Sequence, residues 1–153
     1  MFTVAVSVFA PVALDTAIAY VADFRNAPMW QHGLSTVEVS ESFPAAKSVI
    51  EIRQFLGRRI EAPGDLVDWD PGKGFTVRGH SGPLQVESRY SFTSENGGTR
   101  VGLHLTMAAT GVARVAEPVL RRNLTRELNA AFERLGRLLQ NQYGENTWPS
   151  AEG

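Results

Sequence analysis

Hydrophobic and polar positions alternate along most of this chain. From Phe2 to Phe9 phenylalanine and valine occupy every second position, which is the period of a half-buried strand. Pro11 follows where a helix can begin, and apolar residues at helical spacing predict a short helix that ends near Asp23. The turn-forming segment 23–30 has room for a second short helix.

Between Leu34 and Ala109 the pattern predicts consecutive antiparallel strands joined by short turns. Gly, Pro, Asn and Asp gather at the turns, for example in Asp70-Pro71-Gly72 and in Asn96-Gly97-Gly98. Strands are expected around Val37 and Val39, over Val49–Leu56, over Arg58–Trp69 with an interruption at Pro63-Gly64, around Phe75 and Val77, over Leu84–Phe92 and over Val101–Met107.

A long amphipathic helix is predicted for 115–142, because leucine and alanine recur there every three or four residues. Together these elements predict an α+β fold in which a curved antiparallel sheet of about seven strands wraps around the C-terminal helix. A sheet bent around one helix leaves space between them, so we expect an internal cavity. We assign 1–143 to one domain and 144–153 to a flexible tail.

Composition excludes several kinds of protein. The 153 residues include no cysteine, which removes disulfides and thiolate chemistry, and the net charge of -1 lacks the basic excess typical of nucleic-acid binders. The apolar start, Met1 to Leu14, has no charged region before it and is too short to span a membrane. We therefore expect a cytoplasmic protein that binds no nucleic acid, has no transmembrane segment, and is a monomer or a homodimer.

Several short motifs resemble those of a known family. In order they are Asp23-x-x-Asn26-x-Pro28-x-Trp30, Gly57-Arg58-Arg59, Asp70-Pro71, Gly82-Pro83 before a strand ending in Tyr90-x-Phe92, Gly98-Thr99-Arg100-Val101, and Glu117-Pro118. Their order and spacing over residues 2 to 140 resemble the polyketide cyclase/dehydrase family of the START-related superfamily (SRPBCC). The resemblance implies a helix-grip fold with a deep, mostly apolar pocket, in a superfamily whose members bind lipids, sterols, quinones or polyketides.

Candidate pocket residues follow from the strand register. If the bulky alternating positions face the helix, Arg78, His80, Arg89 and His104 point to solvent. Tyr90 is then the candidate catalytic or orienting group, because a phenol in a dry pocket needs a partner. The predicted ligand-binding set is Trp30, His32, Ile52, Phe75, Val77, Val86, Ser88, Tyr90, Leu103, Leu105 and Leu128.

Metal and cofactor sites are not predicted. His32, His80 and His104 are widely spaced, without the repeat or the carboxylate cluster of a metal site. The leading hypothesis is therefore the binding of a hydrophobic small molecule, lipid-, quinone- or polyketide-like. An enzyme of the polyketide cyclase or dehydratase type, with acid and base groups in the pocket, is the alternative. A protein-interaction module, suggested by the arginine-rich last helix, is the second alternative.

Overall fold

The computed structural model describes residues 1–55 and 57–143, so the predicted tail and Leu56 lie outside the described residues. Its elements in chain order are β1 (Phe2–Ala10), α1 (Leu14–Ala22), the 3-10 helix η1 (Phe24–Met29), β2 (Leu34–Glu38), β3 (Ser48–Phe55), β4 (Arg58–Asp70), β5 (Gly74–Ser81), β6 (Leu84–Glu95), β7 (Gly98–Ala109), the 3-10 helix η2 (Gly111–Ala116) and α2 (Glu117–Tyr143).

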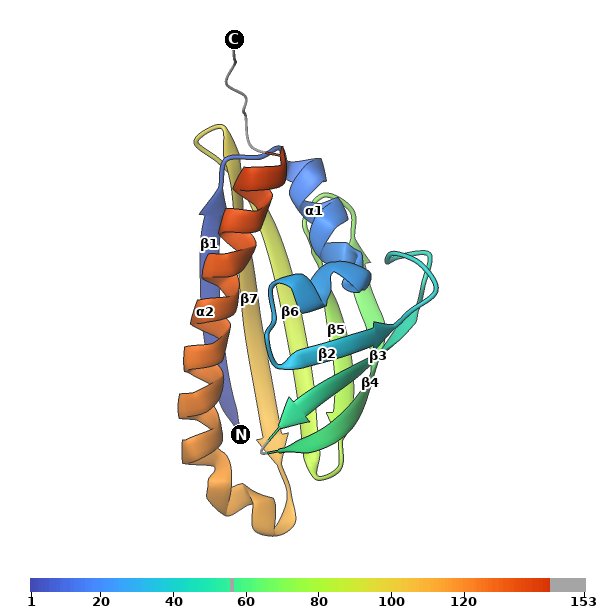
Figure 1. The fold of residues 1–153 in the computed structure, drawn as a ribbon, viewed down its shortest axis with the longest axis vertical. Coiled ribbons are helices and arrows are strands. Elements are labelled where there is room, and N and C mark those ends of the chain that lie inside the picture. The colour runs from blue at the N-terminus through green and yellow to red at the C-terminus, as the bar shows by residue number, and fades with distance from the viewer. Residues whose placement is uncertain (56, 144–153) are drawn as a thin grey trace.

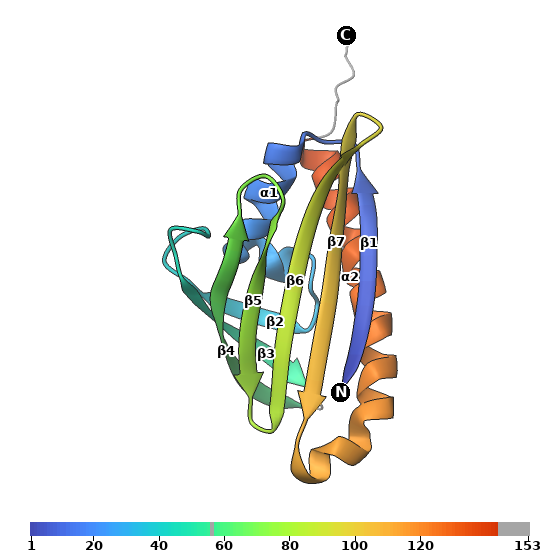
Figure 2. The same cartoon turned by 180° about the vertical axis from the view of Figure 1, so that it is seen from behind.

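The seven strands form one antiparallel sheet in the order β1-β7-β6-β5-β4-β3-β2. The sheet curls into a half-barrel, and α2 lies across its concave side next to β1 and β7 (Figures 1 and 2). The short helices α1 and η1 also lie on the concave side, beside the C-terminal half of α2 (Figure 1). This arrangement confirms the predicted α+β helix-grip fold.

One predicted break in the sheet is absent. We expected an interruption at Pro63-Gly64, but β4 runs continuously from Arg58 to Asp70. Gly64 pairs with Gly79 of β5, and a Cβ at residue 79 would lie only 2.5 Å from the carbonyl oxygen of Pro63. Because neither glycine has a side chain, the two backbones can approach closely and the strand continues through this position.

The long helix begins two residues later than the pattern predicted, at Glu117, after the 3-10 turn η2. The Glu117 carboxylate accepts a hydrogen bond from the backbone N–H of Ala109, at 3.0 Å, which joins the helix start to the end of β7. Near its other end α2 packs tightly on β1, since a Cβ at Gly136 would lie 2.8 Å from a methyl carbon of Val8. Glycine at this position therefore allows close contact between helix and sheet.

Aromatic side chains fill the part of the grip near η1. The Phe75 and Tyr90 rings stack with their centroids 4.9 Å apart, and the Phe24 and Phe43 rings pack at the same centroid distance. The Phe92 ring also stacks with Phe75, with their centroids 6.1 Å apart. These buried rings make a solid core at one end of the concave face and leave the other end free to be hollow.

Candidate ligand cavity

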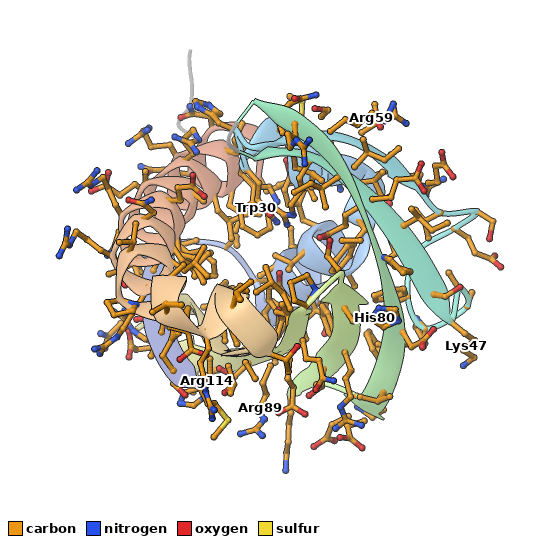
Figure 3. All side chains as sticks on the ribbon, turned by 90° about the horizontal axis from the view of Figure 1, so that it is seen from below. Trp30, Lys47, Arg59, His80, Arg89 and Arg114 are labelled. Carbon is orange, nitrogen blue, oxygen red and sulfur yellow. The ribbon has the colours of Figure 1, made fainter. Side chains whose placement is uncertain are left out.

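A cavity of about 490 Å³ lies between the concave face of the sheet and α2. This volume is within the range of pockets that bind small molecules. Viewed from below, Trp30 lies between helix and sheet, whereas Lys47, Arg59, Arg89 and Arg114 point away from the centre of the molecule (Figure 3). Charged side chains thus surround a space whose interior surface is mainly apolar.

Most of the predicted pocket residues lie on the cavity wall. From the middle strands, β5 supplies Val77, β6 supplies Val86, Ser88 and Tyr90, and β7 supplies Leu103 and Leu105. Trp30 and His32 come from the segment after η1, and Leu128 comes from α2. Whether these side chains contact a ligand stays a prediction, but the structure brings them together around one space.

Two residues of the predicted set lie away from the cavity wall. Phe75 is buried behind Tyr90 in the aromatic core, where stacking uses both faces of its ring. Ile52 is also buried, yet the cavity-lining residues of β3 include its neighbours Glu51 and Arg53. The assumption that bulky alternating residues face the helix is therefore wrong for β3.

Glu51 and Arg53 are among the cavity residues that the sequence argument missed. Arg53 donates from Nη2 to Glu51 Oε1 at 2.9 Å and from Nε to the same oxygen at 3.2 Å. Its Nη2 also donates to Oε1 of the buried Gln31, at 2.8 Å. The ion pair and the contact to the amide satisfy part of the hydrogen-bonding capacity of these groups, which helps polar residues to occupy strand positions that face the cavity.

Tyr90 lines the same cavity as Glu51 and Arg53. It is 6% exposed, lines the cavity, and has its ring fixed between Phe75 and the edge of Phe24. Burial raises the pKa of its hydroxyl, the Glu51 carboxylate raises this pKa further, and Arg53 lowers it in part. Tyr90 is therefore a neutral phenol at any physiological pH, able to donate a hydrogen bond or to accept one.

Within residues 1–55 and 57–143, no protein group forms a hydrogen bond with the Tyr90 hydroxyl. By contrast, the buried hydroxyl of Thr99 donates to the Val12 carbonyl at 2.9 Å. Buried polar groups in proteins nearly always have a partner, and one that faces a cavity can find it in the cavity's contents. We name Gln31, Glu51, Arg53 and Tyr90 together the polar cluster of the cavity.

Contacts between α2 and the segment after η1 hold one side of the cavity together. Arg134 of α2 donates from Nε to the Trp30 carbonyl at 3.2 Å, and the Trp30 ring meets Phe132 edge to face at 5.7 Å. Trp30 is 2% exposed. The tryptophan therefore packs the helix against η1 in addition to lining the cavity.

The remaining candidate groups are dispersed. Arg78, Arg89 and His104 are exposed, as the strand register predicts, whereas His80 is exposed and also adjoins the cavity near the β5–β6 turn. Within the part of the chain that the structure describes, no group of three or more His, Cys, Asp or Glu side chains could hold a metal ion. None of the described helices combines the length and apolar character that crossing a membrane requires.

A curled antiparallel sheet, a long C-terminal helix and a cavity between them define the helix-grip class of proteins. Within that class the chain belongs to the polyketide cyclase/dehydrase and lipid transport family, whose model matches residues 1–140. The predicted family is thereby confirmed. No curated protein matches the chain with significant sequence similarity.

Solved structures agree on the fold. A protein of Thermus thermophilus has a TM-score of 0.75 at 15% identity, with 92% of this chain and 99% of that chain covered. The Zhui aromatase/cyclase of a Streptomyces species has a TM-score of 0.70 at 15% identity, covering 90% and 95%. A START superfamily protein of Mycobacterium smegmatis has a TM-score of 0.65 at 12% identity, covering 87% and 98%. At these identities the likeness concerns the fold alone.

Proposed function

We propose that this protein binds a hydrophobic small molecule in the cavity between the sheet and α2. The observation that supports the proposal most is the cavity itself, about 490 Å³ bordered by Val77, Val86, Leu103 and Leu105 with polar groups at one side. Apolar surface that a ligand buries there contributes about 25 cal/mol per Å² to binding. Family membership, with lipid transport in the family's description, supports the same role.

A fluorescent apolar probe tests this proposal directly. N-phenyl-naphthylamine is uncharged and brightens when it enters an apolar site, so titration into protein that has been extracted with organic solvent should show saturable, stoichiometric binding. Native mass spectrometry before the extraction should show any ligand that remains with the purified protein. A protein that neither binds the probe nor retains a ligand would contradict the proposal.

A pair of matched variants locates the binding. Val86 faces the cavity and its neighbour Gln85 is exposed on β6. In Val86→Trp the added ring occupies part of the cavity, so probe affinity should fall by about tenfold or more, as expected when a ligand loses space it needs. In Gln85→Trp the same side chain stands outside, and probe affinity should stay within about twofold of wild type. Thermal melts show whether both variants fold.

An enzyme of the cyclase or dehydratase type is the second candidate, and one observation favours it. The Glu51 carboxylate and the neutral Tyr90 phenol line the same cavity, where a base and an acid could act on one substrate. In a dehydration, Glu51 would take the proton next to a ketone while Tyr90 donates a proton to the leaving hydroxyl, which departs as water. The assay is the conversion of a β-hydroxyketone to its enone, which is measured by absorbance. Glu51→Gln should lose this conversion and should still bind the probe.

A further inference from the structure

The polar cluster differs from the rest of the cavity in that its charges are already paired. Arg53 contacts the Glu51 carboxylate through Nε and Nη2, and Nη2 also serves Gln31. Both of its recorded contacts to Glu51 reach the same oxygen, Oε1. Within the described residues this leaves Glu51 Oε2, Arg53 Nη1 and the Tyr90 hydroxyl without a recorded partner.

These three free positions suit a particular head group. The Tyr90 hydroxyl and Arg53 Nη1 can donate hydrogen bonds, and Glu51 Oε2 can accept one. A ketone or ester oxygen can accept from the donors, and an alcohol can in addition donate to Glu51. A carboxylate lacks a proton to donate and would bring a second negative charge near Glu51, whose side chain is only 17% exposed.

We infer that the polar cluster selects ligands with an uncharged oxygen head group, such as a ketone, an ester or an alcohol, and rejects carboxylates. The inference rests on the proposed binding function and specifies its ligand class. Arg53 cannot favour a carboxylate as a free arginine would, because its charge is neutralised by Glu51 at 2.9 Å. Selectivity here arises from the cost of placing an unpaired charge beside the partly buried Glu51 carboxylate.

The rim of the cavity is the competing place for a carboxylate. Arg126 and Arg134 line the cavity from α2, and Glu127 lies beside them. A ligand with its charged end at this rim and its apolar chain inside the cavity would not be repelled by the Glu51 carboxylate. The two arrangements therefore differ in how carboxylate affinity responds when the charge of Glu51 is removed.

Displacement of bound N-phenyl-naphthylamine by ligands of one chain length tests the inference. The competitors are decanol, the methyl ketone of the same length, decylamine and decanoate, at pH 8 and below their solubility limits. In the wild type, decanol and the ketone should bind about tenfold or more tightly than decanoate, since an unpaired buried charge is that costly. Equal or tighter binding of decanoate would overturn the inference.

A second experiment removes one carboxylate charge from the cavity. In Glu51→Gln, Arg53 keeps an uncompensated charge, so decanoate affinity should rise by about tenfold while decanol changes little. Glu61→Gln removes the same charge from an exposed position on β4 and should leave the ranking unchanged. Decanoate affinity that stays the same in Glu51→Gln would place the head group at the rim and overturn the inference. Absence of probe binding in the wild type would instead contradict the proposed function.

Discussion

Replacement of Tyr90 by phenylalanine tests whether its hydroxyl is kept for a ligand. When a buried tyrosine hydroxyl has a hydrogen-bond partner in the protein, its removal lowers the free energy of unfolding by about 0.5–1.5 kcal/mol. Tyr90 is buried, but among the described residues its hydroxyl has no recorded partner. Its removal breaks no protein hydrogen bond, so the free energy of unfolding of ligand-free protein should stay the same or increase by up to about 1 kcal/mol.

Thr99 provides a matched control for this variant. Its hydroxyl is fully buried and donates to the Val12 carbonyl at 2.9 Å. Thr99→Val keeps the shape of the side chain and leaves that carbonyl without its donor, which should cost about 1–3 kcal/mol. The two buried hydroxyls therefore predict opposite results from similar chemical changes.

Urea unfolding of organic-extracted protein measures both variants. The midpoint should fall for Thr99→Val and should hold or rise for Tyr90→Phe, with equal slopes if the unfolded states are alike. A domain of this size loses about 2–4 °C in melting temperature per kcal/mol, so thermal melts can verify the result. If Tyr90→Phe loses as much stability as Thr99→Val, its hydroxyl has a partner within the protein, and the reasoning on ligand recognition fails.

Two further predictions concern the fold around the cavity. Gly79→Ala should lower the free energy of unfolding by about 1–3 kcal/mol, because its Cβ would lie 2.5 Å from the Pro63 carbonyl oxygen. The control is Gly33→Ala, whose Cβ would have its nearest neighbour at 4.0 Å. Urea unfolding should show little change in stability for this control. Equal stability of the two variants would contradict this. Asp23→Ala should cost about 1 kcal/mol, because the Asp23 carboxylate caps η1 through the Arg25 N–H. Hydrogen bonds from Arg25 lower the pKa of Asp23, so its contribution is complete above about pH 4 and is lost as the pH falls through the lowered pKa. A stability difference that does not change across this acid range would refute that cause.

The order of elements was predictable because each one depends on neighbours in the sequence. Alternation over 2–9 and the recurrence of leucine in the last helix come from local periodicity, and the turn residues marked the strand boundaries. Errors occurred where a distant contact decided the outcome. β4 continues through Pro63-Gly64 because Gly79 of the next strand accepts a close approach, and nothing near residue 64 in the sequence reveals that partner.

The cavity wall shows the same contrast between what local periodicity predicts and what distant contacts decide. Alternation states which residues share a face of a strand, and on β6 and β7 the apolar face is the one that lines the cavity. On β3 the cavity-lining residues include Glu51 and Arg53, and Gln31 from another segment accepts a hydrogen bond from Arg53. The spacing of these two residues was visible, yet the sequence held no sign that a buried amide lay opposite them.

The sequence by itself therefore determined the class of fold, the family and the apolar character of most of the cavity. Only the tertiary structure decided where the aromatic core ends and the hollow begins, and which polar groups face that hollow. The physical reason is that hydrophobic periodicity is a property of single segments. Ion pairing at Glu51 and the lack of a partner at Tyr90 depend on side chains that meet only when the sheet curls around α2.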